Sequence, residues 1–440
     1  MIPALNASKI YSTLGNGNSL VPLAIKDVAN SLGLTAGSYI TGDSLEGKDR
    51  FIDEFGTQAL WLLGIPAYKK LIDLTLYKLL KIDPKFDVRN LSQKRAKVLE
   101  KSIKYADVSI KDSMKKVAKN TKFTKNLALG KFVVSTLLTI GSYIGLTKYR
   151  HKQTQKNAEK EILAEMQKDK IDFSYTKPEK KTAFCGLQQT KQLTFTGGFQ
   201  DFMFNPVKNL MILDASISAE RLADSRNRQE LIGYTIKEGT FWAFMYFASK
   251  PIQKFFENKV ENNKKMPASI DLDARIIESK ELEKAFKSGE LTKSTSKVLK
   301  LQTAEEMLDF IHKNPEDFTV KMAKMSDVLP TLKQVSQTDN IDYRQFIDFD
   351  EFKGVAEKLD KLNNKFNQYK QSNVTDKTLE AFLKNVKKLK RHAVLKNMGA
   401  CIGVLGVVAP AIMVALRKLD KNNQGFQVKE DLKKQMASKI

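Results

Sequence analysis

The chain has 440 residues and a formal net charge of +24 at pH 7, from 74 Lys and Arg against 50 Asp and Glu. This length accommodates two to three domains. The lysines are spread along the whole chain and form no arginine-rich stripe of the kind that binds nucleic acid. Composition therefore argues against nucleic acid as a partner and favours a lipid bilayer with anionic head groups.

The cysteines and the N-terminal segment indicate the cellular compartment. Cys185 and Cys401 are too few for a disulfide framework, which favours a reducing compartment. Residues 1–20 lack the charged region followed by an apolar region that a secretory signal needs. We therefore expect no cleaved signal peptide.

Residues 54–70, EFGTQALWLLGIPAYKK, contain the first apolar run. Its uncharged part, 57–68, is too short to cross a bilayer as a straight helix, because a span needs about 20 residues. Pro66 interrupts the run, and Lys69 and Lys70 close it. We expect a re-entrant or interfacial segment, or half of a broken span.

A longer apolar segment follows at 129–150, LGKFVVSTLLTIGSYIGLTKYR. We predict a membrane-spanning helix at 129–147 that ends a first repeat, 1–150, with Lys131 extending to the interface. Residues 151–200 are rich in Lys, Gln and Thr and are predicted to be a flexible polar linker, whose strand-like piece is QLTFTGGF.

Residues 238–254, EGTFWAFMYFASKPIQK, repeat the pattern of 54–70, with the apolar part at 239–249. Five landmarks recur in the two halves in the same order at nearly equal spacing, and the fifth is the long apolar segment that ends each half. The first four are Pro22, Gly56, Pro66 and Asp87-x-Arg89 in the first half, and Pro206, Gly239, Pro251 and Asp273-x-Arg275 in the second. This order indicates an internal duplication, and residues 201–276 form the first part of the second copy.

Glu54 and Glu238 precede the two apolar runs at matching places, with Arg50 and Lys237 nearby. An acidic residue at membrane depth marks a candidate functional site. The alternative, which we favour, is structural, because the positive end of a helix dipole stabilises a carboxylate at the N-terminus of a short helix.

The second half carries additional polar sequence before its apolar segment. Residues 277–350 are predicted to form an inserted helical subdomain. Within it, Thr303 and Glu306 have the spacing of a capping box, and Asn314-Pro315 ends the helix that follows.

Residues 351–396 show two apolar seams in steps of three and four, at 352–369 and 379–393. Such narrow seams join helices together, and the polar segment KQSNVTD between them is suited to a turn. The pattern favours an antiparallel helical hairpin. Two amphipathic helices that pack separately on a globular core are the alternative.

Residues 397–416, NMGACIGVLGVVAPAIMVAL, are uncharged and flanked by lysines. Their length approaches that of a membrane span, so we predict a membrane-spanning helix followed by a basic tail at 417–440. Gly399, Gly403 and Gly406 lie about one turn apart, and small residues so spaced let another helix approach closely. We expect any homo-oligomer to form through this glycine face.

The sequence assigns no catalytic, cofactor-binding or metal-binding residue. His151, His312 and His392 stand far apart, and no Cys/His spacing matches a zinc site. Phosphate-loop, nucleophile-elbow and dinucleotide-binding motifs are absent. Residues 420–431, DKNNQGFQVKED, match an EF-hand loop at four positions but depart from it at positions eight and twelve.

We predict an all-α, membrane-embedded helical protein made of two diverged repeats, with a polar helical subdomain that contains an antiparallel hairpin. We expect an integral membrane protein with a structural or interaction role rather than an enzyme, in the cytoplasmic membrane of a bacterium. A transporter- or channel-like oligomer is the alternative, because Pro-interrupted segments at matching places in two halves mark binding sites in transporters. The mean hydropathy of −0.36 counts against it. A soluble helical scaffold or a basic nucleic-acid-binding protein is the further alternative.

Overall fold

The structure is a computed structural model. It describes residues 7–14, 20–41, 44–168, 205–225, 228–264, 272–332, 339–371, 376–419 and 432–433. These residues are almost entirely helical, with no β-strand among them and one isolated β-bridge, between Thr331 and Ile341. The all-α class is therefore confirmed. The strand-like piece of the linker and the EF-hand-like segment lie outside the described residues.

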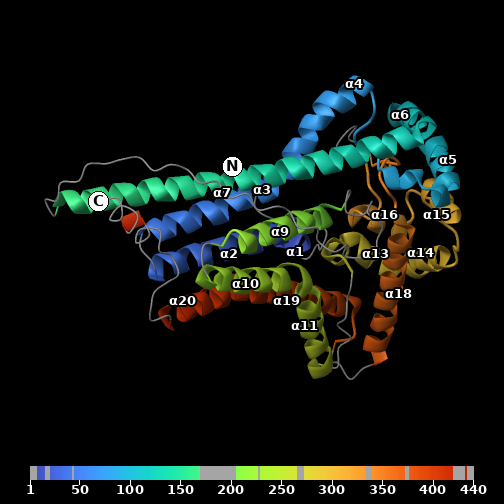
Figure 1. Ribbon diagram of the computed structural model, residues 1–440. Helices are drawn as coiled ribbons and strands as arrows, with labels where there is room; N and C mark the ends of the chain where they lie inside the picture. The colour runs from blue at the N-terminus through green and yellow to red at the C-terminus, as the bar shows by residue number, and fades with distance from the viewer. Residues whose placement is uncertain are drawn as a thin grey trace, which may run out of the picture.

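Long helices that lie side by side in Figure 1 are called the bundle here. They are α2 (Leu20–Thr41), α3 (Ser44–Ile72), α7 (Thr121–Lys168), α9 (Pro206–Ala223), α10 (Arg228–Trp242), and a rod of α19 (Leu379–Gly403), the π-helical segment η5 (Val404–Val408) and α20 (Ala409–Leu419). Shorter elements adjoin them: α1 (Ala7–Leu14), the π-helical η1 (Asp73–Tyr77) with α4 (Lys78–Leu80), and the π-helical η4 (Ala243–Phe247) with α11 (Ser249–Lys264).

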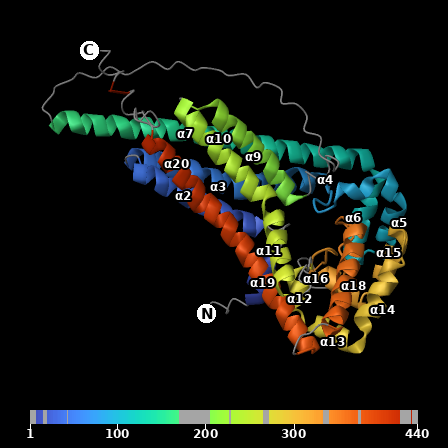
Figure 2. The ribbon, with the colours of Figure 1, turned by 90° about the horizontal axis from the view of Figure 1, so that it is seen from below.

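The remaining helices form an end domain at one end of the bundle (Figures 1 and 2). It contains two short 3₁₀ turns, η2 (Val88–Leu91) and η3 (Gln93–Arg95), and the helices α5 (Ala96–Tyr105), α6 (Val108–Lys119), α12 (Ala274–Glu278), α13 (Lys280–Ser288), α14 (Glu290–Leu299), α15 (Ala304–Lys313), α16 (Phe318–Met325) and α18 (Phe349–Gln371). The inserted segment is helical, as predicted, and the capping box of Thr303 and Glu306 is present.

Two long helices run from the end domain toward the same side of the molecule in Figure 1, and Figure 2 shows that they lie at an angle to each other. These are α7 and the α19–α20 rod. α3 packs along α7 and α2 packs along the rod, while α9 contacts α7 and α10 contacts the rod. Each long helix is thus flanked by one helix from residues 20–72 and one from residues 206–242.

The bundle exposes many large apolar side chains on its outside. Leu137 on α7 is 62% exposed and Val407 on the rod is 65% exposed, and similar residues occur on α2, α3 and α10. In the described part of the end domain, Val108 is the one large hydrophobic residue that is exposed. The end domain has an apolar core, which includes Leu308 and Phe352. The outer surface of the bundle is therefore rich in large apolar side chains, whereas the described surface of the end domain is nearly free of them.

Two helical segments, Thr121–Glu165 and Leu379–Leu416, are long and apolar enough to cross a membrane. They contain the predicted spans at 129–147 and 397–416. Only 28% and 22% of their most apolar windows are buried within the protein. A core helix of a soluble protein would be mostly buried.

The end domain joins residues far apart in the sequence. The backbone N–H of Asp87 donates to the Arg344 carbonyl at 2.9 Å, and the Asn90 amide donates to the same carbonyl at 3.2 Å. The Arg344 guanidinium pairs with Asp83 at 2.8 Å. Residues 82–119 and the inserted segment therefore form one folded unit.

Close helix packing within the chain uses one glycine of the predicted oligomer face. A β-carbon at Gly33 of α2 would lie 2.1 Å from the carbonyl oxygen of Gly406. Only glycine permits this approach. A β-carbon at Gly399 or Gly403 would have no neighbour within 4 Å. Gly406 is therefore covered by α2, and only Gly399 and Gly403 remain open to another molecule.

Three local expectations were wrong. Pro66 lies inside α3, which continues to Ile72, whereas the helix near Pro251 does break, at Ala248. Residues 151–168 belong to α7 rather than to a linker. Both arms of the predicted hairpin are helices, but α18 and α19 meet near the turn and then diverge (Figure 2). The apolar seam of α18 is buried mainly against α14 instead.

Candidate functional site: a buried ionic network

One face of α3 carries acids and bases into the interior of the bundle. Asp49, Arg50, Asp53, Glu54 and Thr57 are spaced by three or four residues, which places them along one side of a helix. Asp49, Asp53 and Glu54 are buried. Arg50 lies 3.6 Å from both Asp53 and Glu54.

Arg221 on α9 connects three helices. Its Nη1 donates to Glu238 of α10 at 2.9 Å. Its Nη2 lies 3.4 Å from Asp53 and 4.0 Å from Glu54, and donates to the Thr57 hydroxyl at 3.3 Å. The Arg221 side chain is only 7% exposed, so these groups are its environment.

Lys237 on α10 is 2% exposed and donates to Glu54 Oε1 at 2.5 Å. The neighbouring Glu238 accepts a hydrogen bond from the Ser218 hydroxyl at 2.6 Å. Trp242 in turn donates to the Ser218 hydroxyl at 3.1 Å. The carboxylates of α3 and α10 are therefore each bound to a cation or donor from another helix.

Arg150 extends the set to α7. Its Nη1 lies 3.1 Å from Asp53 and 3.9 Å from Asp49. The Thr154 hydroxyl, one turn further along α7, donates to Asp49 at 2.6 Å. α7 is thereby joined to α3 by charge as well as by apolar packing.

We call these charged side chains the ionic network. It comprises four carboxylates and four cations, namely Asp49, Asp53, Glu54, Glu238, Arg50, Arg150, Arg221 and Lys237. The formal charges balance. Removing ions from water costs several kcal/mol each, and pairing only partly offsets that cost. A network of this kind is therefore better suited to fixing one helix arrangement, or to function, than to increasing stability.

A small cavity of about 20 Å³ lies beside the network. It is lined by network side chains together with Asp27 of α2, Asp214 of α9 and Trp61. This volume holds one water molecule. Asp214 accepts a hydrogen bond from the Tyr246 hydroxyl. Arg221 and Lys237 also line the cavity, but within the described residues neither Asp27 nor Asp214 forms an ion pair.

The structural explanation favoured for Glu54 and Glu238 was wrong. Both lie within helices, Glu54 ten residues after the start of α3 at Ser44 and Glu238 near the end of α10, so neither is stabilised by a helix N-terminus. Both belong to the same network. Arg50 and Lys237, which are their neighbours in the sequence, also lie close to them in space.

Sequence reasoning missed Asp53, Arg150 and Arg221. The available signal was the spacing of charges on α3, where Asp49 and Asp53, and Arg50 and Glu54, each lie four residues apart and so face the same side of the helix. No sequence pattern connects Arg221 to that face, because Arg221 and Asp53 lie 168 positions apart in the chain.

Among the described residues, no group of three or more His, Cys, Asp and Glu side chains is placed to hold a metal ion. No family model, no curated protein and no solved structure matches this chain. Functional inference therefore rests on the geometry alone.

Proposed function

We propose that this chain is an integral membrane protein. Its bundle would lie in the bilayer around the ionic network, and its end domain would stand at one membrane surface as an interaction module. The observation that supports this most is the reversed surface of the bundle, with charges inside and large apolar side chains outside. In water, leaving this apolar surface exposed would cost about 25 cal/mol of free energy per Å² relative to burying it.

The position of the end domain agrees with a location outside the bilayer. Both candidate spans begin at this domain, and its described surface is nearly free of large apolar residues. A domain with a conventional apolar core and a lysine-rich surface is stable in water next to anionic head groups. We infer a structural or interaction role, because the cavity beside the ionic network, about 20 Å³, has room for one water molecule and not for a larger solute.

We also propose that the bundle arose by internal duplication. Two consecutive helices precede Asp87-x-Arg89 in one half and Asp273-x-Arg275 in the other, and both Asp residues cap a short helix. The Asp-x-Arg turn is weak support, since Asp342-x-Arg344 has the same internal hydrogen bonds. Stronger support is the exchange of partners, in which each long helix packs on one helix from each half.

Carbonate extraction of membranes at high pH tests membrane residence. We expect the wild-type chain to remain in the pellet. V407R/V408R should shift it to the soluble or aggregated fraction, since each Arg at a span centre costs about 2.5–3.5 kcal/mol. V108R is the matched control, because Val108 is exposed on the end domain. Wild-type protein in the carbonate supernatant would contradict the proposal.

Proton or ion transport is the second candidate function. It is favoured by Asp27 and Asp214, which face the cavity without an ion-pair partner, because unpaired intramembrane carboxylates occur in proton pathways. Proteoliposomes with an entrapped pH-sensitive dye would test it. Proton flux that is lost in D27N and D214N would establish transport. Flux equal to that of protein-free vesicles would leave the structural role.

A further inference from the structure

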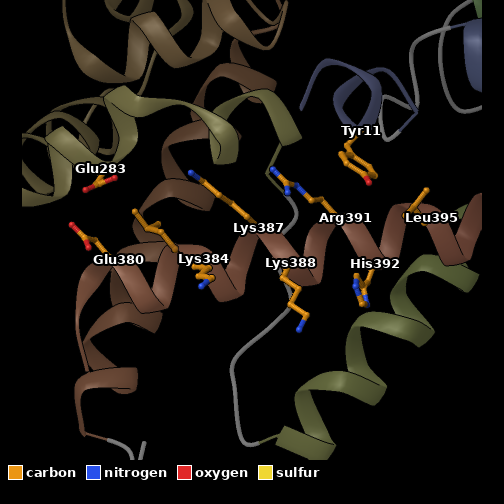
Figure 3. Close-up of a pocket in the computed structure, with 10 residues that line it drawn as sticks. Tyr11, Glu283, Glu380, Lys384, Lys387, Lys388, Arg391, His392 and Leu395 are labelled. Carbon is orange, nitrogen blue, oxygen red and sulfur yellow. The ribbon is translucent and has the colours of Figure 1, made fainter. Parts of the chain in front are cut away.

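A groove of about 560 Å³ lies along the N-terminal part of α19, where α1 and α13 approach it (Figure 3). Its α19 wall is basic and includes Lys384, Lys387, Lys388, Arg391 and His392. In Figure 3, Lys387 and Arg391 point to one side of α19, and Lys388 and His392 point to the other. The groove therefore presents cations on both sides of a single helix.

Some charges in the groove are already paired. Arg391 binds Glu278 through two hydrogen bonds of 2.7 Å, and its guanidinium lies over the Tyr11 ring. At the other end, Glu283 binds Lys287 at 2.7 Å, and Lys287 also lies 3.6 Å from Glu380. These acidic side chains therefore do not neutralise the rest of the groove.

Lys384, Lys387 and Lys388 remain available. Within the described residues none of the three forms a hydrogen bond or an ion pair, and Lys384 and Lys388 are exposed. Lys384 and Lys388 lie four residues apart on the same side of α19 (Figure 3), so their ammonium groups repel each other, and an anion between them would relieve this repulsion. An anion with several oxygens, such as a phosphate, matches point-charge donors of this kind.

The groove continues into apolar surface. Leu395 lines it and is 46% exposed, and further along the same rod Val407 and Val408 are exposed as well. The order along the rod is thus basic and then apolar. An anionic phospholipid has the same order, with a phosphate followed by acyl chains.

We propose that this groove binds the phosphate-bearing head group of an anionic phospholipid, with the acyl chains along the rod beyond Leu395. This proposal deepens, and rests on, the membrane location proposed above. It assigns Lys384 and Lys388, which share one side of α19, as the residues that hold the phosphate. Bound lipid would fix the angle at which the end domain meets the membrane surface, because the groove includes residues of both α13 and α19.

Isothermal titration calorimetry of the full-length chain in detergent tests the proposal. The probes are short-chain phosphatidylglycerol, short-chain phosphatidylcholine and glycerol phosphate. We expect phosphatidylglycerol to bind the wild-type chain at least about tenfold more tightly than either of the other two. K384Q/K388Q should weaken phosphatidylglycerol binding by about tenfold or more, since each replaced Lys removes one electrostatic attraction to the anionic head group.

The matched control is K293Q/K297Q. These lysines are also exposed and four residues apart, but they lie on α14 of the end domain. An equal loss of affinity in this control would reduce the effect to net charge and overturn the site. Equal binding of glycerol phosphate would identify a soluble phosphate ligand instead of a lipid. Equal binding of phosphatidylcholine, or no binding, would also overturn the proposal.

Carbonate extraction of the same variants separates the two proposals. K384Q/K388Q should stay in the membrane pellet, because the apolar span at 397–416 is unchanged. Wild-type protein that stays in the pellet but binds phosphatidylglycerol and phosphatidylcholine equally would refute lipid binding in the groove alone. Wild-type protein that leaves the pellet would refute the membrane location.

Discussion

Lys237 donates a 2.5 Å hydrogen bond to Glu54, which lies 183 positions earlier in the chain. Aligning Gly56-Thr57 with Gly239-Thr240 gives the same offset, so under the proposed duplication Glu54 would be equivalent to Lys237 rather than to Glu238. In a symmetric ancestor this position would face its own copy, and two equal charges would repel. Under the proposed duplication, opposite charges at this position let the halves bind each other within one chain.

The first prediction concerns this pair. E54Q and K237Q should each destabilise the bundle by about 3–5 kcal/mol, because each leaves a buried charge without its partner. The double variant E54Q/K237Q should lose less than the sum of the two. Unfolding in detergent can be followed by tryptophan fluorescence, since Trp61 lines the cavity and Trp242 donates to Ser218.

The exposed pair Glu283 and Lys287 provides the control for that cycle. The two side chains lie 2.7 Å apart on α13, and the lysine is 57% exposed. E283Q and K287Q should each change stability far less than E54Q and K237Q do, because solvent screens the pair. Additive effects of E54Q and K237Q would show that the two residues do not interact.

The second prediction concerns the contact between α2 and the rod. G33A should destabilise the bundle by about 1–3 kcal/mol or more, because the added methyl group would meet the Gly406 carbonyl oxygen and the Pro410 ring. G403A should be neutral or stabilising by up to about 1 kcal/mol, since its methyl group meets open space in a helix. The midpoint of thermal unfolding measures both, and equal destabilisation would contradict the packing described.

The third prediction concerns the pH dependence of the end domain. A hydrogen bond from the Lys101 ammonium, assisted by one from the Tyr105 hydroxyl, holds the pKa of Asp309 below its usual range. A depressed carboxyl pKa contributes stability that is present above the unfolded pKa of about 3.9 and is lost as pH falls through the folded value. D309N should therefore speed amide exchange in α5 a few-fold at pH 7.

The same measurement below the folded pKa of Asp309 is the control. There the wild-type carboxyl is protonated, so the wild-type and D309N chains should exchange α5 amides at the same rate. His312 stacks on Tyr105 in both chains and therefore cancels in the comparison. A difference that persists unchanged at low pH would exclude an ionic contribution of Asp309.

Local patterns in the sequence predicted the elements that depend on neighbouring residues. The capping box at Thr303 and the long apolar segments at 129–147 and 397–416 were found because their signals lie within one helix. Pro66 was misjudged for a related reason. A proline removes one backbone donor, but packing of α3 along α7 holds the helix through it.

The ionic network and the hairpin depended on long-range packing, which no local pattern encodes. Glu54 has partners on α9 and α10, and the side chains of α18 pack mainly on α14, with Phe366 and Tyr369 meeting Phe382 of α19 near the turn. The sequence singled out Glu54 and Glu238, with a structural explanation favoured for both. It could not show that they face each other's cations, because that requires the relative positions of four helices.

Spin-label accessibility is the measurement that tests the membrane-embedded bundle most directly. Single cysteines at Leu137, Val407 and Val108, in a chain with Cys185 and Cys401 replaced by Ala, would carry the label in reconstituted bilayers. All three positions are exposed on the protein surface. Labels at 137 and 407 should collide mainly with lipid-soluble oxygen, and the label at 108 mainly with a water-soluble nickel chelate. Nickel accessibility at 137 and 407 equal to that at 108 would contradict the account.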